Sequence, residues 1–356
     1  HGSKQNLLDM IDLYEKDLPK LKKHIKGFPS PDALRTICKQ GRQGAAPFKG
    51  YTTATEGSDW IIKCARKEST RPLWILVWGG LDDLAQALHD APDIQNKIRV
   101  YWIGGPNKKW STNSYVYIVE NFPNLWFIEA NASYRGFITN DKQPGKFNKD
   151  YYDECIRGAG HLGKDYIKYY DGKVKMGDTP SLLYMMDGDP NNPQKESWGG
   201  SFEKFTHSPR VIFNRSTTLK DTVPVYAIIE FRIKGPEMNI PADSTCFTMT
   251  TDGQDWDGFY LGNGEYAVRY APKSTAVLTY KITSDIPGFP EQTGEFVVNN
   301  TWPGKIDADD YKLGDYWYTD RNDANLFEGK WQGSKTVSKW RKDVLQDWAK
   351  RWELLK

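Results

Sequence analysis

The most informative stretch of the chain reads Pro72-Leu-Trp-Ile-Leu-Val-Trp-Gly-Gly-Leu-Asp-Asp-Leu-Ala-Gln-Ala-Leu88. Its apolar run over 73–78 has the length and composition of a strand that is buried on both faces, as in parallel sheets. Gly79 and Gly80 allow a tight turn and let a ligand approach the backbone. Apolar residues then recur at helical spacing from Leu81. The stretch predicts a strand, a turn and a helix, with the turn at the sheet edge where open α/β sheets bind ligands. An ordinary βα unit without a ligand is the alternative interpretation.

Strand and helix patterns alternate through the first half of the chain. Apolar residues at helical spacing cover 5–25, with Pro19 as a kink or a boundary, and Ser30 is a plausible N-cap for a second helix. A third helix is expected over 57–66. The run 98–106 repeats the pattern of a strand that ends in two glycines, and 125–129 forms a further short strand. This alternation predicts a mostly parallel sheet with helices on both faces.

The pattern changes after residue 208. Short runs rich in Val, Thr, Tyr and Phe predict strands over 223–233, 246–250, 266–270, 276–283 and 294–298. Turn residues separate them at Asp252-Gly253, Gly262-Asn-Gly264 and Ile286-Pro-Gly288. From residue 334 the pattern is helical again, with apolar residues along one side at Trp340, Val344, Leu345, Trp348 and Trp352.

Three segments follow from this change of pattern. We predict an α/β domain over 1–207 and an inserted antiparallel β-sandwich module over 208–305. The remaining residues, 306–356, are expected to return to the α/β domain and to supply its closing helix.

Composition disfavours some partners and favours one. The chain has 356 residues and a formal net charge of +2, with acidic and basic residues interspersed, so nothing points to nucleic acid. No apolar run is long enough to span a bilayer, so membrane insertion is not expected. Aromatic residues make up 14%, including 14 Trp and 20 Tyr, and exposed rings of this kind suit the apolar faces of sugars. The four scattered cysteines are expected to be unpaired, mostly buried thiols.

A carboxylate and a hydroxyl stand before an apolar helix pattern in Gly177-Asp178-Thr179-Pro180-Ser181-Leu-Leu-Tyr-Met-Met-Asp187. As structure, Asp178 or Thr179 is the N-cap and Pro180 lies in the first turn. As chemistry, Asp178 is a hard oxygen ligand that faces a pocket and suits calcium or sugar hydroxyls. The local sequence is compatible with both interpretations.

Two further polar segments are candidate site loops. The stretch 187–200, with Asp189 and Trp198, is rich in Gly and Pro, so it either lines a site or forms a solvated loop. The stretch 131–136 follows a predicted strand and contains Tyr134 and Arg135. Arg135 either pairs with a carboxylate or caps the sheet.

Four separated motifs, in the same order, resemble one known family. Trp78-Gly-Gly-Leu-Asp-Asp-Leu-Ala resembles the Gly-Pro-Leu-Thr-Asn-Leu-Ala segment of nucleoside hydrolases, and Gly177-Asp-Thr-Pro-Ser resembles their His-Asp-Pro segment. Tyr134-Arg-Gly, Gly177-Asp-Thr-Pro-Ser and Ser197-Trp-Gly-Gly look closer to the nucleoside-hydrolase-like domain of bacterial cellulose-binding proteins. The run Trp340-Arg-Lys-Asp-Val-Leu-Gln-Asp-Trp resembles that family's closing helix, so the resemblance covers 1–205 and 306–356.

The resemblance implies a fold, a cofactor and a set of site residues. It implies a nucleoside-hydrolase-like sheet with flanking helices, and a calcium ion held by the Asp178 carboxylate and by a backbone carbonyl at Asp82. Together with the polar loops, it gives as substrate-binding residues Trp78, Gly79, Gly80, Asn113, Tyr134, Arg135, Thr179, Asp189 and Trp198. Catalytic residues are not assigned, because the family's opening Asp-rich motif has no counterpart in this sequence and Gly177 stands where nucleoside hydrolases have His.

Three hypotheses of function follow. The first is a glycoside or N-glycoside hydrolase of carbohydrate metabolism, in which metal-assisted water attacks an anomeric carbon. The second is a non-catalytic polysaccharide-binding protein on a decayed hydrolase scaffold, and the third is a structural or adhesive surface protein. The expected partner is a carbohydrate or a nucleoside-like small molecule. The resemblance further implies a bacterial protein that is secreted or periplasmic.

Overall fold

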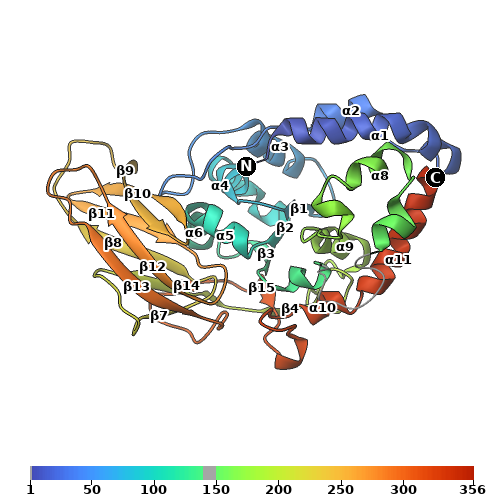
Figure 1. The fold of residues 1–356 in the computed structure, drawn as a ribbon. Helices are drawn as coiled ribbons and strands as arrows, with labels where there is room; N and C mark the ends of the chain where they lie inside the picture. The colour runs from blue at the N-terminus through green and yellow to red at the C-terminus, as the bar shows by residue number, and fades with distance from the viewer. Residues whose placement is uncertain (1, 139–149) are drawn as a thin grey trace.

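The computed structural model describes residues 2–138 and 150–356, which form an α/β part and a β-rich part side by side (Figure 1). The sheet of the α/β part has the spatial order β1, β2, β3, β15, β4. These strands are β1 Leu73–Val77, β2 Ile98–Ile103, β3 Trp126–Ala130, β4 Phe202–Lys204 and β15 Trp317–Asp320. The first four in that order run parallel, and β4 pairs antiparallel with β15. The mostly parallel α/β sheet expected from the sequence is thus confirmed.

Helices surround this sheet. The α-helices are α1 Lys4–His24, α2 Pro31–Ile37, α3 Glu56–Ala65, α4 Asp82–Asp90, α5 Pro106–Trp110, α6 Thr112–Asn121, α8 Gly160–Tyr166, α9 Thr179–Asp187, α10 Lys335–Ser338 and α11 Arg341–Trp352. Shorter helical segments are η1 Pro92–Lys97, η2 Ser133–Phe137, η3 Tyr152–Ile156, η4 Tyr170–Gly172, η5 Ala324–Leu326 and η6 Glu353–Leu355. No helix in the described part of the chain has the length and apolar character needed to cross a bilayer.

Local signals set where the first helices begin, and packing decides where one of them ends. The Ser30 hydroxyl accepts a hydrogen bond from the Ala33 N–H at 3.2 Å and so caps α2, as predicted. Pro19, expected as a kink or a boundary, lies inside α1, which continues to His24. Leu18 and Leu21 on the same helix are buried. We attribute the continuation to this packing, which offsets the backbone hydrogen bond that proline cannot donate.

β1 is an edge strand, contrary to the expectation that it is buried on both faces. All five of its residues are half-buried, whereas β3 is buried throughout. Among the described residues β1 pairs with β2 alone. Its outer edge and part of each face therefore lack the cover that a central strand of a parallel sheet receives.

The β-rich part is one sheet with the spatial order β6, β8, β11, β10, β9, β12, β13, β7. Its strands are β6 Arg210–Phe213, β7 Thr222–Pro224, β8 Ile228–Lys234, β9 Ser244–Thr251, β10 Gln254–Gly262, β11 Glu265–Tyr270, β12 Ala276–Thr283 and β13 Gln292–Asn299. Neighbouring strands pair antiparallel except at the two ends, where β6 joins β8 and β7 joins β13 in parallel. The Phe231 ring on β8 lies 4.6 Å from the Tyr280 ring on β12, although other strands separate β8 from β12 within the sheet. The sheet therefore folds back on itself around an aromatic core.

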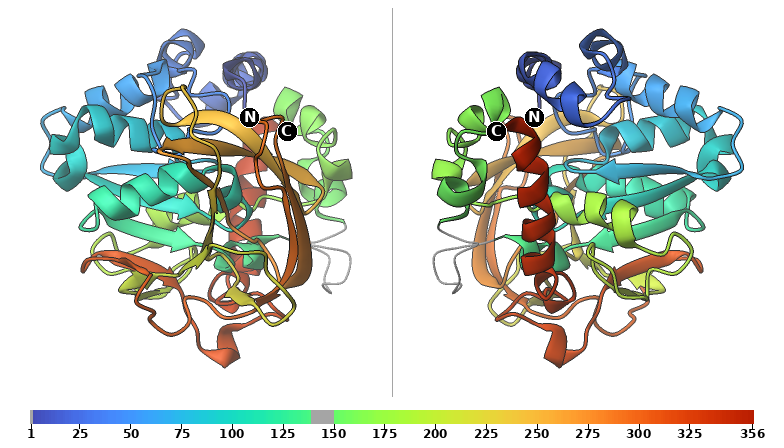
Figure 2. Two further views of the ribbon diagram at one scale, coloured as in Figure 1. Left: turned by 90° about the vertical axis from the view of Figure 1, so that its left-hand side faces the viewer. Right: turned by 90° about the vertical axis from the view of Figure 1, so that its right-hand side faces the viewer.

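The chain enters and leaves the β-rich part at one place. The short strands β5 His207–Ser208 and β14 Tyr311–Lys312 pair antiparallel, so the two crossing segments lie side by side. After β14 the chain supplies β15 to the α/β sheet and ends near α11, which Figure 2 shows in red along one side of the molecule. Val344 and Leu345 of α11 are buried in one cluster with Ile156 and Leu183 of the α/β part.

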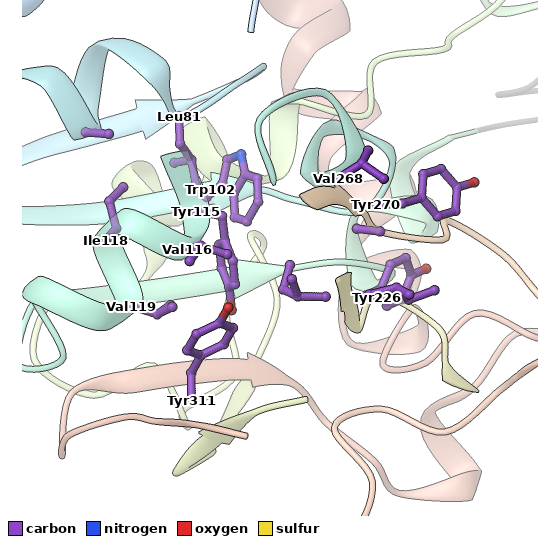
Figure 3. Packing of buried hydrophobic residues seen from close by; sticks show 14 of the residues in the cluster. Leu81, Trp102, Tyr115, Val116, Ile118, Val119, Tyr226, Val268, Tyr270 and Tyr311 are labelled. Atoms are coloured by element: carbon purple, nitrogen blue, oxygen red, sulfur yellow. The ribbon is translucent and has the colours of Figure 1, made fainter. Parts of the chain in front are cut away.

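One apolar core continues from the α/β part into the β-rich part. Trp102 and Tyr115 from the first and Tyr226 and Tyr270 from the second belong to the same buried cluster (Figure 3). No disulfide joins the four cysteines in the described part of the chain, and all four are half-buried rather than fully buried. Apolar packing therefore joins the two parts without a covalent link.

Candidate functional site

The loops after β1, β2 and β3 meet at one edge of the α/β sheet, because the carboxyl ends of parallel strands lie together. The Trp102 indole N–H donates to the Gly79 carbonyl at 2.9 Å, which ties the end of β2 to the turn after β1. The Gly105 N–H donates to Asn131 Oδ1 at 2.8 Å, which ties the loop after β2 to the loop after β3. Direct hydrogen bonds therefore join the three loops.

The glycines at this edge serve two different purposes. A Cβ at Gly80 would lie 3.2 Å from Ser111 Cβ and 2.5 Å from Asp82 Oδ2. Gly105 has a φ of +44°, and a Cβ there would lie 2.6 Å from the Asn131 carbonyl oxygen. These positions need glycine for close packing. A Cβ at Gly79 would meet nothing within 4 Å, so the backbone there is open to a ligand.

The start of α9 reaches the same edge. The Trp78 indole N–H donates to Ser181 Oγ at 2.7 Å, and Ser181 Oγ donates to the Asp178 carbonyl at 2.9 Å. Trp78 is 52% exposed, so its ring is anchored through the N–H while much of it stays open to solvent. The fold thus brings together Trp78 and Asp178, two site residues that the sequence places far apart.

Asp178 is the N-cap residue of α9 and Pro180 lies in the first turn, as expected from the sequence. The Asp178 side chain makes no capping hydrogen bond, so its carboxylate is not used to hold the helix start. Burial raises the pKa of Asp178 to about 6. A carboxyl group that ionises near neutral pH at such an edge can exchange a proton or accept hydrogen bonds from sugar hydroxyls.

Tyr134 and Thr179 lie next to Asp178. A Cβ at Gly177 would lie 3.0 Å from Tyr134 Cδ2, so the tyrosine ring packs against the residue before Asp178. Tyr134 is 5% exposed, and burial raises the pKa of its hydroxyl to about 12. Thr179 is the first residue of α9 and is half-buried.

Within the part of the chain that the structure describes, Arg135 stacks on an aromatic ring and pairs with no carboxylate. Its guanidinium carbon lies 4.5 Å from the centre of the Trp331 ring, on which it stacks. The stacking links the loop after β3 to the return segment of the chain.

Asp320, at the end of β15, holds the loop after β3 in place. Its carboxylate accepts hydrogen bonds from the backbone N–H groups of Asn131 at 2.9 Å, Ala132 at 2.7 Å and Ser133 at 3.0 Å. The side chain is fully buried, and burial raises the pKa of Asp320 to about 7 against these donors, which favour the carboxylate. Asp320 therefore positions the loop that carries Tyr134. Sequence reasoning missed it, although the strand-like run 316–320 was a signal that could have shown it.

The residues expected to hold calcium do not fit a calcium site by themselves. Asp82 Oδ1 accepts hydrogen bonds from the Ala46 N–H at 2.8 Å and from Ser114 Oγ at 3.0 Å, and burial raises the pKa of Asp82. The described residues hold no group of three or more acidic, His or Cys side chains that could bind a metal ion. Calcium takes six to eight oxygen ligands. Asp178 and Asp82 alone therefore support no calcium-dependent step.

Asn113, expected to contact the substrate, is occupied by other contacts. Its Nδ2 donates to the Ala46 carbonyl at 3.1 Å, and its Oδ1 accepts from the Arg269 guanidinium at 3.4 Å. The side chain thus joins α6 to the loop near residue 46 and to the β-rich part.

The structure places Asp189 away from this edge. Asp189 pairs with Lys195 at 2.6 Å, and Arg99, near the start of β2, donates to Asn191 Oδ1 at 2.9 Å. The loop after α9 therefore lies at the amino edge of the sheet. Trp198 packs into the cluster below α11. Asp189 lies at the amino edge because of the length of α9: nine residues of helix span about 13 Å and carry the chain across the sheet.

Cavities lie at both edges of the sheet. A cavity of about 830 Å³ at the carboxyl edge is lined by α1 residues and by Gly79, Gly80, Asp82, Asn107 and Trp110. A larger cavity of about 1330 Å³ lies at the amino edge, lined by residues that include Trp74, Arg99, Trp126 and Asn191. Parallel sheets bind ligands at the carboxyl edge, so the smaller cavity, which borders the Gly79–Gly80 turn directly after Trp78, is the candidate site.

Comparison with known proteins supports a nucleoside-hydrolase-like fold for the α/β part. The family model described as "Cellulose-binding Sde182, nucleoside hydrolase-like domain" matches residues 1–202. The chain belongs to this family. The nucleoside-hydrolase-like resemblance of the four sequence motifs is thus confirmed. A second model, a domain of unknown function called DUF5060, matches 222–285 in the β-rich part.

Solved structures are similar to this family member at low identity. A nucleoside hydrolase-related hypothetical protein from Saccharophagus degradans, described as associated with carbohydrate metabolism, is 18% identical; the match covers 84% of this chain and 88% of that chain with a TM-score of 0.46. A putative glycoside hydrolase from Bacteroides vulgatus is 24% identical over 22% of this chain and 16% of its own, with a TM-score of 0.20. A search of curated proteins finds no match.

Proposed function

We propose that this protein binds a glycan at the carboxyl edge of its parallel sheet, over Trp78 and the Gly79–Gly80 turn. The observation that carries the proposal is the Trp78 ring, which is 52% exposed while its N–H is fixed on Ser181. An aromatic ring held in this way offers an apolar face at low conformational cost, and the apolar face of a sugar ring is complementary to it.

The surroundings of Trp78 supply the polar groups that a sugar requires. The Gly79 backbone is open, and the Asp178 carboxylate makes no capping hydrogen bond to α9, so both are available to hydroxyl groups. Ligand sites combine such apolar surfaces with a few placed polar groups. The family description names cellulose, which supports a β-linked glucan as the ligand class and, with it, a place of action outside the cytoplasm.

Titration of the protein with cellohexaose tests this function. The variant Trp78→Ala is expected to bind about ten-fold more weakly, because loss of one aromatic contact is worth about 1.4 kcal/mol. Tyr316→Ala is the matched control, since Tyr316 is also an exposed aromatic residue, 50% exposed, but lies at the amino edge. Unchanged affinity of Trp78→Ala, or no binding of cellohexaose by the wild-type protein, would contradict the proposal.

Glycoside hydrolysis is the second candidate function. It is favoured by the pKa of Asp178, raised by burial to about 6, because a general acid works best when it is partly protonated near the working pH. Asp178 would then protonate the leaving oxygen as its bond to the anomeric carbon breaks, while a water molecule bonds to that carbon and releases a proton to solvent. Release of reducing ends from cellohexaose, with and without millimolar calcium, distinguishes the two functions. Hydrolysis that Asp178→Asn abolishes would support an enzyme, and binding without release would support recognition alone.

A further inference from the structure

A second exposed tryptophan, Trp110 at the end of α5, lines the same cavity as the glycine turn. It is 40% exposed and borders the cavity with Gly79, Gly80 and Asn107. Its neighbour Ser111 is in contact with the turn, since a Cβ at Gly80 would lie 3.2 Å from Ser111 Cβ. Trp78 comes directly before this turn in the chain, and Trp110 borders the cavity beside it.

The β-rich part supports Trp110 from behind. The Trp110 ring lies 5.2 Å from the ring of Trp256 on β10, measured between ring centres. Trp256 is 9% exposed and packs edge-on against Tyr270 on β11 at 5.3 Å. Trp110 is therefore the outermost of a row of aromatic rings that leads from the core of the β-rich part to the cavity.

A buried polar contact fixes α5 against the same part. The Lys109 side chain is 2% exposed, and its Nζ donates to Gln254 Oε1 at 2.6 Å and lies 3.5 Å from Asp252 Oδ2. Asp252 and Gly253 connect β9 to β10 with positive φ values of 51° and 67°, the geometry of a tight hairpin turn. The hairpin tip thus sets the position of α5 and, with it, that of Trp110.

We infer that Trp110 is a second sugar-stacking surface and that the ligand is an oligosaccharide long enough to lie on Trp78 and Trp110 together. This inference rests on the proposed glycan-binding function and adds the length of the ligand to it. The cavity of about 830 Å³ lies in the upper part of the range for small-molecule sites and exceeds the needs of one sugar ring. The β-rich part takes a role in recognition, because it holds the second surface in place.

Calorimetric titration with cellobiose and cellohexaose tests the inference. Trp110→Ala is expected to weaken cellohexaose binding about ten-fold and to change cellobiose binding by less than about two-fold, because the short ligand is held by Trp78 alone. Trp110→Phe keeps an aromatic ring and is expected to retain most of the affinity for cellohexaose. If Trp110→Ala does not fold, Trp110→Gln replaces it with the same expectation, since Gln suits a helix.

The outcomes separate this inference from the function on which it rests. If Trp78→Ala weakens cellohexaose binding and Trp110→Ala does not, the second surface is refuted and the glycan site stands. Equal loss of cellobiose and cellohexaose binding in Trp110→Ala would also refute a separate surface. Failure of the wild-type protein to bind either ligand would overturn both proposals.

Discussion

Replacing Asp178 by Asn is expected to stabilise the protein at neutral pH. The side chain makes no capping hydrogen bond, and burial raises its pKa from 3.8 to about 6. The folded wild-type protein holds the Asp178 proton more tightly than the unfolded chain does. This proton therefore stabilises the wild-type protein fully below about pH 4, and the stabilisation is lost as the pH rises through about 6. The rise in pKa corresponds to at most about 3 kcal/mol at pH 8. Solvent screening of the partly exposed side chain and the favourable charge at a helix start reduce the expected gain to about 1–2 kcal/mol.

Thermal unfolding of the two proteins at pH 4 and pH 8 measures this effect. We expect equal melting temperatures at pH 4 and a melting temperature about 2–5 °C higher for Asp178→Asn at pH 8. Asp189→Asn is the matched control, because a hydrogen bond from Lys195 lowers the pKa of Asp189, so its removal is expected to lose stability rather than to gain it. An Asp178→Asn variant that is no more stable than the wild-type protein at pH 8 would refute the reasoning.

Three further results are expected. Asp320→Ala leaves three buried N–H groups without an acceptor, so this variant is expected to lose about 3 kcal/mol or more of unfolding free energy. Asp320→Asn is expected to lose less. Equal stability of Asp320→Ala and the wild-type protein in denaturant unfolding would contradict the positioning role. Millimolar calcium is expected to leave the melting temperature unchanged, because the described residues hold no group of three or more acidic, His or Cys side chains that could bind a metal ion. A clear rise in melting temperature would reveal a site that these residues do not account for. The 356-residue chain is expected to release no ribose from inosine or uridine, since Gly177 stands in place of His and no base is assigned; robust release would show that it has its own base.

Local signals were enough to predict the parallel sheet but not its strand order. The apolar run over 73–78 and the glycines after it are contiguous, and such patterns report directly on strand and turn. The position of β1 at the edge and the insertion of β15 between β3 and β4 depend on pairings between distant segments. The strand β10 was not predicted from the sequence, although the turns at both of its ends were.

The candidate site was predictable where a residue lies next to a strand end or a helix start. Trp78 follows the end of β1, Asp178 precedes the start of α9, and the two come together in the fold. Asp189 was misplaced, because it follows α9 directly and that helix carries the chain to the opposite edge. Trp110 was missed, because a single Trp in a helical pattern looks the same whether its ring is exposed or buried, and only the tertiary structure decides between them.

A crystal structure of the protein with bound cellohexaose tests the central claim, glycan binding at the carboxyl edge, most directly. We predict one sugar ring stacked on Trp78 with a hydroxyl group within hydrogen-bond distance of Asp178, and a following ring near Trp110. Sugar bound instead at the amino-edge cavity beside Arg99, or only on the surface of the β-rich part, would contradict the claim.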